Sequence, residues 1–183
     1  GCLSKGDFVI IAAYVNTGKT ILAVSEATYM AQQLVEGTVL WFNNEEFNDK
    51  VIKKFWNATL NSTSKLIQEN PISAQVAYKK KMRGDLNRIK LIDIRNKDLK
   101  FIKNQFKLLQ PSLVIVDQID KIPSLTKKTW QEHHRLKDLY GAFRALANEY
   151  CPVIAISQAD ATTRWFDKQT QAIKYQKYLD QSQ

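Results

Sequence analysis

The sequence has few cysteines: only Cys2 and Cys151 occur among its 183 residues. Two thiols are too few for a disulfide framework or a metal knuckle, so they predict reduced cysteines in a cytosolic protein. No apolar run approaches the roughly 20 residues that a membrane-spanning helix requires. No signal peptide precedes the first apolar run, which begins at Phe8. We therefore expect a cytoplasmic protein without a membrane partner.

Acidic residues are also scarce relative to basic ones. The chain carries 27 Lys and Arg against 18 Asp and Glu, which gives a formal net charge of +9 and an isoelectric point near 9.5. Such a surplus attracts polyanions, and nucleic acid is the first candidate. A surface that is merely basic, with no bound polyanion, is the alternative.

The chain has neither an internal repeat nor a linker that would divide it, and its length suits one domain with a single core. Apolar runs with strand character alternate with segments of helical spacing. This alternation predicts βαβ units, and hence an α/β fold with a mostly parallel β-sheet flanked by helices. The predicted strands span residues 8–12, 38–42, 89–94, 113–116 and 153–156, and the predicted helices span 21–32, 51–60, 99–109 and 136–147.

Two stretches give weaker patterns. Residues 61–87 contain breaks at 61–64 and 69–71, followed by a helical segment near 78–83 that Gly84 ends. Residues 159–183 are rich in glutamine and have a thin apolar pattern. We expect this tail to be poorly packed, and either partly helical or ordered only against a partner.

Between the first strand and the first helix lies a loop typical of phosphate binding. It ends in Gly18-Lys19-Thr20 and resembles the P-loop pattern G-x-x-x-x-G-K-[ST], although Ala13 stands in place of the first glycine. In such a loop the backbone N–H groups and the helix N-terminus cradle phosphate oxygens. Lys19 is then expected to reach the terminal phosphates, and the Thr20 hydroxyl to bind Mg²⁺. The predicted nucleotide-binding residues are Ala13, Tyr14, Val15, Asn16, Thr17, Gly18, Lys19 and Thr20.

Polar residues follow three further predicted strands, at the edge of the sheet where α/β proteins bind ligands. Asp117 follows four apolar residues and fits a Walker B carboxylate that orients Mg²⁺. Glu45 and Glu46 follow the second strand, where a glutamate can deprotonate an attacking water. Gln158 ends the last strand and can hydrogen-bond a γ-phosphate. Each alone could be a solvated residue at a strand end, but together they predict an ATP site with Lys19 among its catalytic residues.

The order of P-loop, glutamate, aspartate and glutamine resembles the RecA-like core of hexameric replicative DNA helicases, namely the DnaB type and the phage primase–helicases. The resemblance covers residues 5–160, and alanine often stands in this family where the chain has Ala13. Asn44-Glu45-Glu46 is similar to the motif of the family's catalytic base. The position relative to the following helix favours Glu45, with Glu46 as the second choice. Residues 113–117 match the family's Walker B motif, and Ser157-Gln158 matches its sensor motif.

This resemblance implies an ATP-dependent DNA helicase that needs Mg²⁺, translocates on single-stranded DNA and unwinds duplex DNA. It also implies a homo-hexameric ring, a primase domain or primase partner, and the cytoplasm of a bacterium or of a phage-infected host. We interpret residues 1–183 as a single RecA-like P-loop NTPase domain from a longer chain. The family's arginine finger and later DNA-binding loops have no counterpart that we can identify here.

Two other functions remain open from the sequence. A P-loop kinase for a small metabolite usually carries a lid with several arginines, whereas residues 61–83 are rich in lysine and contain one arginine. A RecA-like recombinase or a loader ATPase that binds ATP only to assemble would not need Glu45 and Asp117, which this chain keeps.

Overall fold

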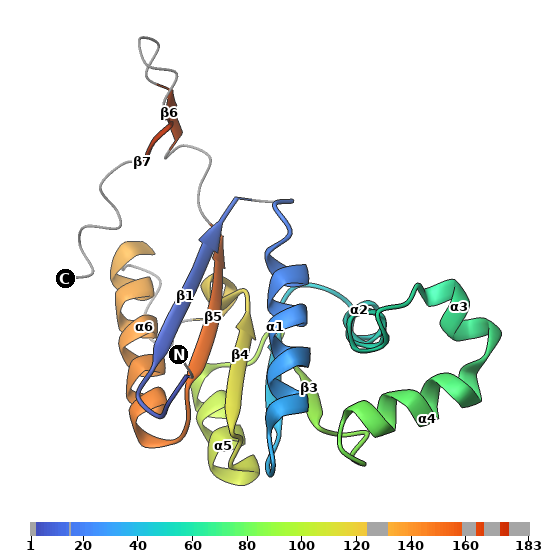
Figure 1. Cartoon of the computed structure of the whole chain (residues 1–183). Helices are drawn as coiled ribbons and strands as arrows, with labels where there is room; N and C mark the ends of the chain where they lie inside the picture. Colours follow the sequence, from blue (N-terminus) through green and yellow to red (C-terminus); the bar gives the residue numbers. More distant parts are fainter. Residues whose placement is uncertain (1–2, 15, 124–131, 159–163, 167–172, 176–183) are drawn as a thin grey trace.

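The computed structural model describes residues 3–14, 16–123, 132–158, 164–166 and 173–175. Its centre is a five-stranded sheet in the order β1-β5-β4-β2-β3 (Figure 1). Neighbouring strands of this sheet run parallel, which confirms the predicted α/β class. The strands are β1 (Phe8–Ala13), β2 (Val39–Asn43), β3 (Ile89–Asp93), β4 (Leu113–Asp117) and β5 (Val153–Gln158).

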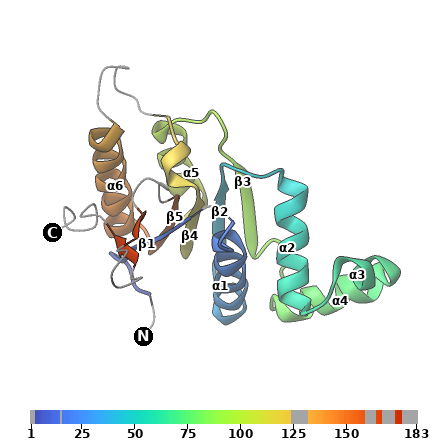
Figure 2. The ribbon, with the colours of Figure 1, turned by 90° about the horizontal axis from the view of Figure 1, so that it is seen from above.

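Helices cover both faces of this sheet (Figure 2). Side chains alternate between the two faces along a strand, so Trp41 and Phe42, which are neighbours in β2, belong to opposite hydrophobic clusters. All five residues of β2 and all five of β4 are buried. Their sequences therefore read as apolar runs up to the last residue of each strand, Asn43 or Asp117. One face packs against α5 (Leu99–Leu109) and α6 (Glu132–Glu149), and the other against α1 (Lys19–Gln33) and α2 (Asn48–Leu60).

The stretch between α2 and β3 folds as two short helices, α3 (Ser64–Glu69) and α4 (Pro71–Lys81). The two predicted breaks are confirmed, one at the end of α2 and one between α3 and α4. Trp56 of α2 stacks on Tyr78 of α4, with 4.3 Å between the ring centroids. This stacking anchors α4 to the α1–α2 side of the domain.

Three helices begin two to four residues before their predicted starts: α1 at Lys19, α2 at Asn48 and α6 at Glu132. The first turns of these helices are largely polar, so apolar spacing does not reveal them. Over the residues that the structure describes, no helix is both long and apolar enough to cross a membrane.

In the tail, the described residues form strands, while the expected partial helix, or ordering against a partner, stays a prediction for residues 159–183. Two strands, β6 (Arg164–Phe166) and β7 (Ile173–Tyr175), pair antiparallel in a separate two-stranded sheet. Aromatic and β-branched residues dominate both strands, and such residues favour strands over helices. The other residues of the range 159–183 lie outside the described residues.

We expect substitution of Phe106 by Ala to destabilise the fold strongly. Phe106 is fully buried in α5 and contacts the rings of Phe42 and Tyr150. Removing a buried phenyl ring should lower the free energy of unfolding by about 3–5 kcal/mol. Urea denaturation followed by circular dichroism measures this loss. Leu108→Ala is the matched control on the same helix, because Leu108 is 75% exposed, and its effect should stay within about 0.5 kcal/mol. Equal losses for the two variants would contradict the assignment of the core.

Candidate functional site

The segments predicted to form the site lie side by side at the carboxyl edge of the sheet. β1, β5, β4 and β2 are consecutive strands, and each carries one predicted segment at or just after its end. The register sets their levels: Ala13 pairs with Gln158, and Asn43 pairs with Asp117. The parallel topology therefore brings together residues that are far apart in the sequence.

Two residues of the predicted P-loop adopt the left-handed conformation. Asn16 has a φ of 60° and Gly18 a φ of 86°, a region that asparagine and glycine tolerate better than other residues do. The Thr17 hydroxyl donates to the Tyr14 carbonyl at 2.7 Å and closes the turn. The first turn of α1, which follows Gly18, has neither a side-chain cap nor an acidic residue. Its backbone N–H groups thus suit an anion. Val15 lies outside the described residues.

Lys19 is held at the mouth of this loop. Its side chain is 8% exposed, and its Nζ donates to the carbonyls of Ala13 and Tyr14 at 2.7 and 2.6 Å. The ammonium group is therefore placed between the end of β1 and the start of α1. A phosphate at the helix N-terminus would lie within reach of this cation.

Asp117 places a carboxyl group in the interior at the end of β4. Its side chain is fully buried, and no group among the described residues donates a hydrogen bond of regular geometry to either of its oxygens. Burial raises the pKa of Asp117 to about 6, and repulsion from Glu45 adds to the rise. The Thr20 hydroxyl and the Gln118 backbone amide offset part of this rise in pKa, so Thr20 lies beside Asp117. A carboxylate and a hydroxyl placed together suit a hard cation.

The two glutamates after β2 differ in their partners. Both carboxylate oxygens of Glu46 accept hydrogen bonds from Lys54 Nζ, at 2.7 and 2.6 Å. Glu45 makes a longer contact of 3.5 Å between its Oε1 and Lys121 Nζ. Glu45 also contributes more to the raised pKa of Asp117 than Glu46 does. Glu46 is thus engaged by a cation from α2, while the charge of Glu45 acts more strongly on Asp117.

Gln118, the residue after Asp117, is a site residue that the sequence analysis missed. It is buried and has a φ of 44°, a strained conformation for a residue other than glycine. Its carbonyl accepts from Asn44 Nδ2 at 3.2 Å, and its Nε2 donates to Gln158 Oε1 at 3.5 Å. Gln118 therefore joins the loops that follow β2 and β4 to the end of β5. The signal that could have found it is its place directly after a buried strand that ends at the ligand edge.

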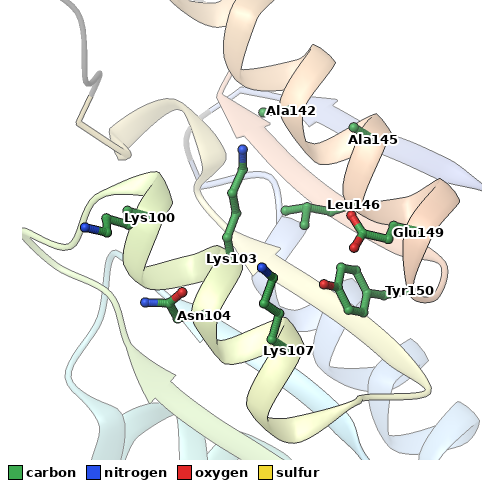
Figure 3. Close-up of a pocket in the computed structure, with 9 residues that line it drawn as sticks. All are labelled: Lys100, Lys103, Asn104, Lys107, Ala142, Ala145, Leu146, Glu149 and Tyr150. Carbon is green, nitrogen blue, oxygen red and sulfur yellow. The ribbon is translucent and has the colours of Figure 1, made fainter.

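A cavity of about 370 Å³ lies elsewhere, between α5 and α6 (Figure 3). Lys103 and Lys107 line it from α5, Glu149 lines it from the last residue of α6, and Tyr150 lines it from directly after that helix. No predicted site residue lines this cavity, so it is not part of the candidate site.

Comparison with known proteins agrees with this arrangement. The chain has the fold of a solved DnaB-like replicative helicase, described together with its interactions with primase, with a TM-score of 0.71 and 18% sequence identity. The match covers 88% of this chain but 41% of that helicase chain, so the present chain spans about two fifths of its length. No curated protein matches the chain. The model of the DnaB-like helicase C-terminal domain matches residues 1–171. The chain therefore belongs to the family of DnaB-like helicase C-terminal domains.

Proposed function

We propose that this chain is the ATP-driven motor domain of a replicative DNA helicase, which translocates on single-stranded DNA and unwinds duplex DNA by hydrolysing ATP. The observation that carries the proposal is the Asp117 carboxyl group. Asp117 is buried at the end of β4, beside Thr20, which is the last residue of the predicted P-loop. No group among the described residues donates a hydrogen bond of regular geometry to its carboxyl oxygens. Burying a carboxylate with only weak contacts to Thr20 and Gln118 is costly, and a bound cation would compensate for this cost.

The donor set fits Mg²⁺ carried by a nucleotide. Mg²⁺ usually takes one or two protein ligands and completes its shell with phosphate oxygens and waters. In agreement, the described part of the chain contains no group of three or more His, Cys, Asp or Glu side chains that could hold a metal by themselves. Thr20 and Asp117 would hold the ion, and the first turn of α1 with Lys19 would hold the phosphates. When bound, Mg²⁺ supplies positive charge against the terminal phosphates of ATP.

The remaining site residues take distinct roles in this proposal. Glu45 accepts a proton from the attacking water, because its charge is less neutralised than that of Glu46. Gln158 donates its side-chain amide to the γ-phosphate and so distinguishes ATP from ADP. This amide nitrogen is left to a ligand because Gln118 Nε2 donates to the Oε1 of Gln158.

The proposed partners follow from charge and family. A net charge of +9 suits single-stranded DNA, and we propose that the whole protein forms a homo-hexameric ring that works with a primase domain or partner in the cytoplasm. The solved helicase of the same fold is described with its primase interactions. Phosphate release measured with and without single-stranded DNA separates the candidate functions. A motor is stimulated by DNA, a loader releases little phosphate, and a metabolite kinase does not respond to DNA.

We expect Lys19→Ala to abolish ATP hydrolysis and to weaken Mg·ATP binding. Alanine cannot neutralise charge on the terminal phosphates as the bond to the γ-phosphate breaks. Calorimetry with Mg·ATP and a phosphate-release assay measure the two effects. Lys107→Ala is the control and should match the parent, because Lys107 is exposed and α5 packs on the opposite face of the sheet from α1. Parent-like hydrolysis by Lys19→Ala would show that the P-loop assignment is wrong.

The two glutamates should differ sharply when each is changed to glutamine. Glu45→Gln removes the proposed general base and should slow hydrolysis by about 10²- to 10⁴-fold. Glu46→Gln only weakens an ion pair with Lys54, so hydrolysis should change by less than about tenfold. Single-turnover hydrolysis rates measure both. The reverse order of effects would assign the base to Glu46.

Asp117→Asn should make the metal-free protein more stable at neutral pH. Since the folded pKa of Asp117 is raised from 3.8 to about 6, its ionisation favours the unfolded state as pH rises through this window. The resulting loss in the free energy of unfolding is absent below about pH 4 and reaches about 3 kcal/mol above pH 6. Thermal unfolding should therefore show a gain for Asp117→Asn at pH 7.5 that disappears at pH 4.

The same experiment with added Mg·ATP tests the cation. The parent should gain stability from the bound ligand, and Asp117→Asn should gain much less because it has lost a metal ligand. A variant that is less stable than the parent at pH 7.5, yet equal to it at pH 4, would show that the burial of Asp117 carries no such cost.

A further inference from the structure

The carboxylate of Asp120 joins three elements beside the proposed site. Asp120 lies in the 3₁₀ turn η1 (Ile119–Lys121), directly after β4. Its Oδ1 accepts from the Ser157 hydroxyl at 3.0 Å and from the Tyr140 hydroxyl of α6 at 3.2 Å. Its Oδ2 accepts from the Gln158 backbone N–H at 2.6 Å. One side chain thus ties η1 and α6 to the end of β5.

The Asp120 carboxylate accepts a backbone hydrogen bond from β5 beyond the point where β5 stops pairing with β4. The pairing of β4 with β5 ends at Val116 and Ala155, so no residue of β4 pairs with Gln158. On its other side Gln158 still pairs with Ala13 of β1. The backbone N–H of Gln158 donates to the Asp120 carboxylate instead of to a strand. Asp120 therefore fixes the backbone from which the Gln158 side chain extends.

The turn that carries Asp120 is itself held in place. Arg135 of α6 donates from its guanidinium group to the carbonyls of Asp120 and Ile122, at 2.8 and 2.9 Å. The next residue in η1, Lys121, lies 3.5 Å from Glu45. A shift of η1 would therefore move contacts both at the end of β5 and at the proposed general base, Glu45.

We propose that Asp120 is a positioning residue, which sets the Gln158 amide so that the site distinguishes ATP from ADP and which connects that amide to η1. The hydrogen bonds of the Asp120 carboxylate run to Tyr140, Ser157 and Gln158, and in this proposal Asp120 acts through Gln158. This inference rests on the proposed function, because it needs a nucleotide whose γ-phosphate Gln158 can contact.

The test is the ratio of the affinities for Mg·ATPγS and Mg·ADP, measured by calorimetry on the full chain. Asp120→Asn keeps the size of the side chain but replaces one acceptor oxygen with a donor amide, so the three hydrogen bonds cannot all form. The ratio should fall about tenfold, the effect of losing one hydrogen bond to a charged group. In a Gln158→Ala background the same substitution should change the ratio by less than about twofold, because coupled residues are not additive.

Asp98→Asn is the matched control. Asp98 also accepts a hydrogen bond from a backbone N–H, that of Phe101 at 2.8 Å, and caps α5. The same chemical change there should leave the affinity ratio at the parent value. If Asp120→Asn does not fold, Tyr140→Phe and Ser157→Ala each remove one donor to the same carboxylate and should lower the ratio in the same direction, by less.

The outcomes separate the two levels of the proposal. A parent chain that binds no Mg·ATPγS overturns the proposed function and this inference with it. A parent that binds both nucleotides, together with an Asp120→Asn variant of unchanged ratio, overturns the positioning role alone. An equal fall of the ratio in the parent and in the Gln158→Ala background also overturns it, since Asp120 would then act independently of Gln158.

Discussion

The site depends on one constraint, the burial of both faces of the parallel sheet. Every residue of β2 and β4 is buried, so polar side chains can occur only at the strand ends, and the ligand edge collects them. Asp117 is a strand-end residue whose carboxyl group is nevertheless fully buried. The two hydrophobic clusters that sandwich the sheet provide the stability against which this unfavourable burial is tolerated.

Local electrostatics then separate groups that look alike in the sequence. Glu45 and Glu46 are adjacent and follow the same strand, yet only Glu46 is held closely by Lys54. The loop that carries both glutamates is shaped by Asn43, whose Nδ2 donates to the Glu46 carbonyl and to Asn48 Oδ1. This anchored loop turns Glu46 toward α2 and leaves Glu45 to interact with Asp117. Two carboxylates in different environments can thus serve different roles.

The sequence predicted the fold and the meeting of four segments at one edge of the sheet, because both depend on local patterns. Asp117, Gln158 and the glutamates directly follow apolar runs, and parallel topology places such strand ends together. Asp120 and Gln118 depend on partners that lie 38 and 40 positions away in the sequence, and no local spacing reveals such contacts. In the tail, likewise, β6 and β7 pair antiparallel, and the thin apolar spacing of this stretch did not indicate that pairing.

The contacts of Lys19 indicate how binding at the P-loop is connected to the rest of the site. Its ammonium group donates to the carbonyls of Ala13 and Tyr14, and Ala13 pairs with Gln158 across β1 and β5. Each of these charged hydrogen bonds is worth about 1.5–3 kcal/mol, so withdrawing Lys19 into water would be costly. Transfer to phosphate oxygens exchanges these bonds for others of the same kind. In the proposed nucleotide complex, Lys19 would therefore change its acceptors at the strand end beside Gln158 and keep its hydrogen bonds satisfied. The pair of Ala13 and Gln158 thus connects the contacts of Lys19 with the hydrogen bond between Gln158 and Asp120.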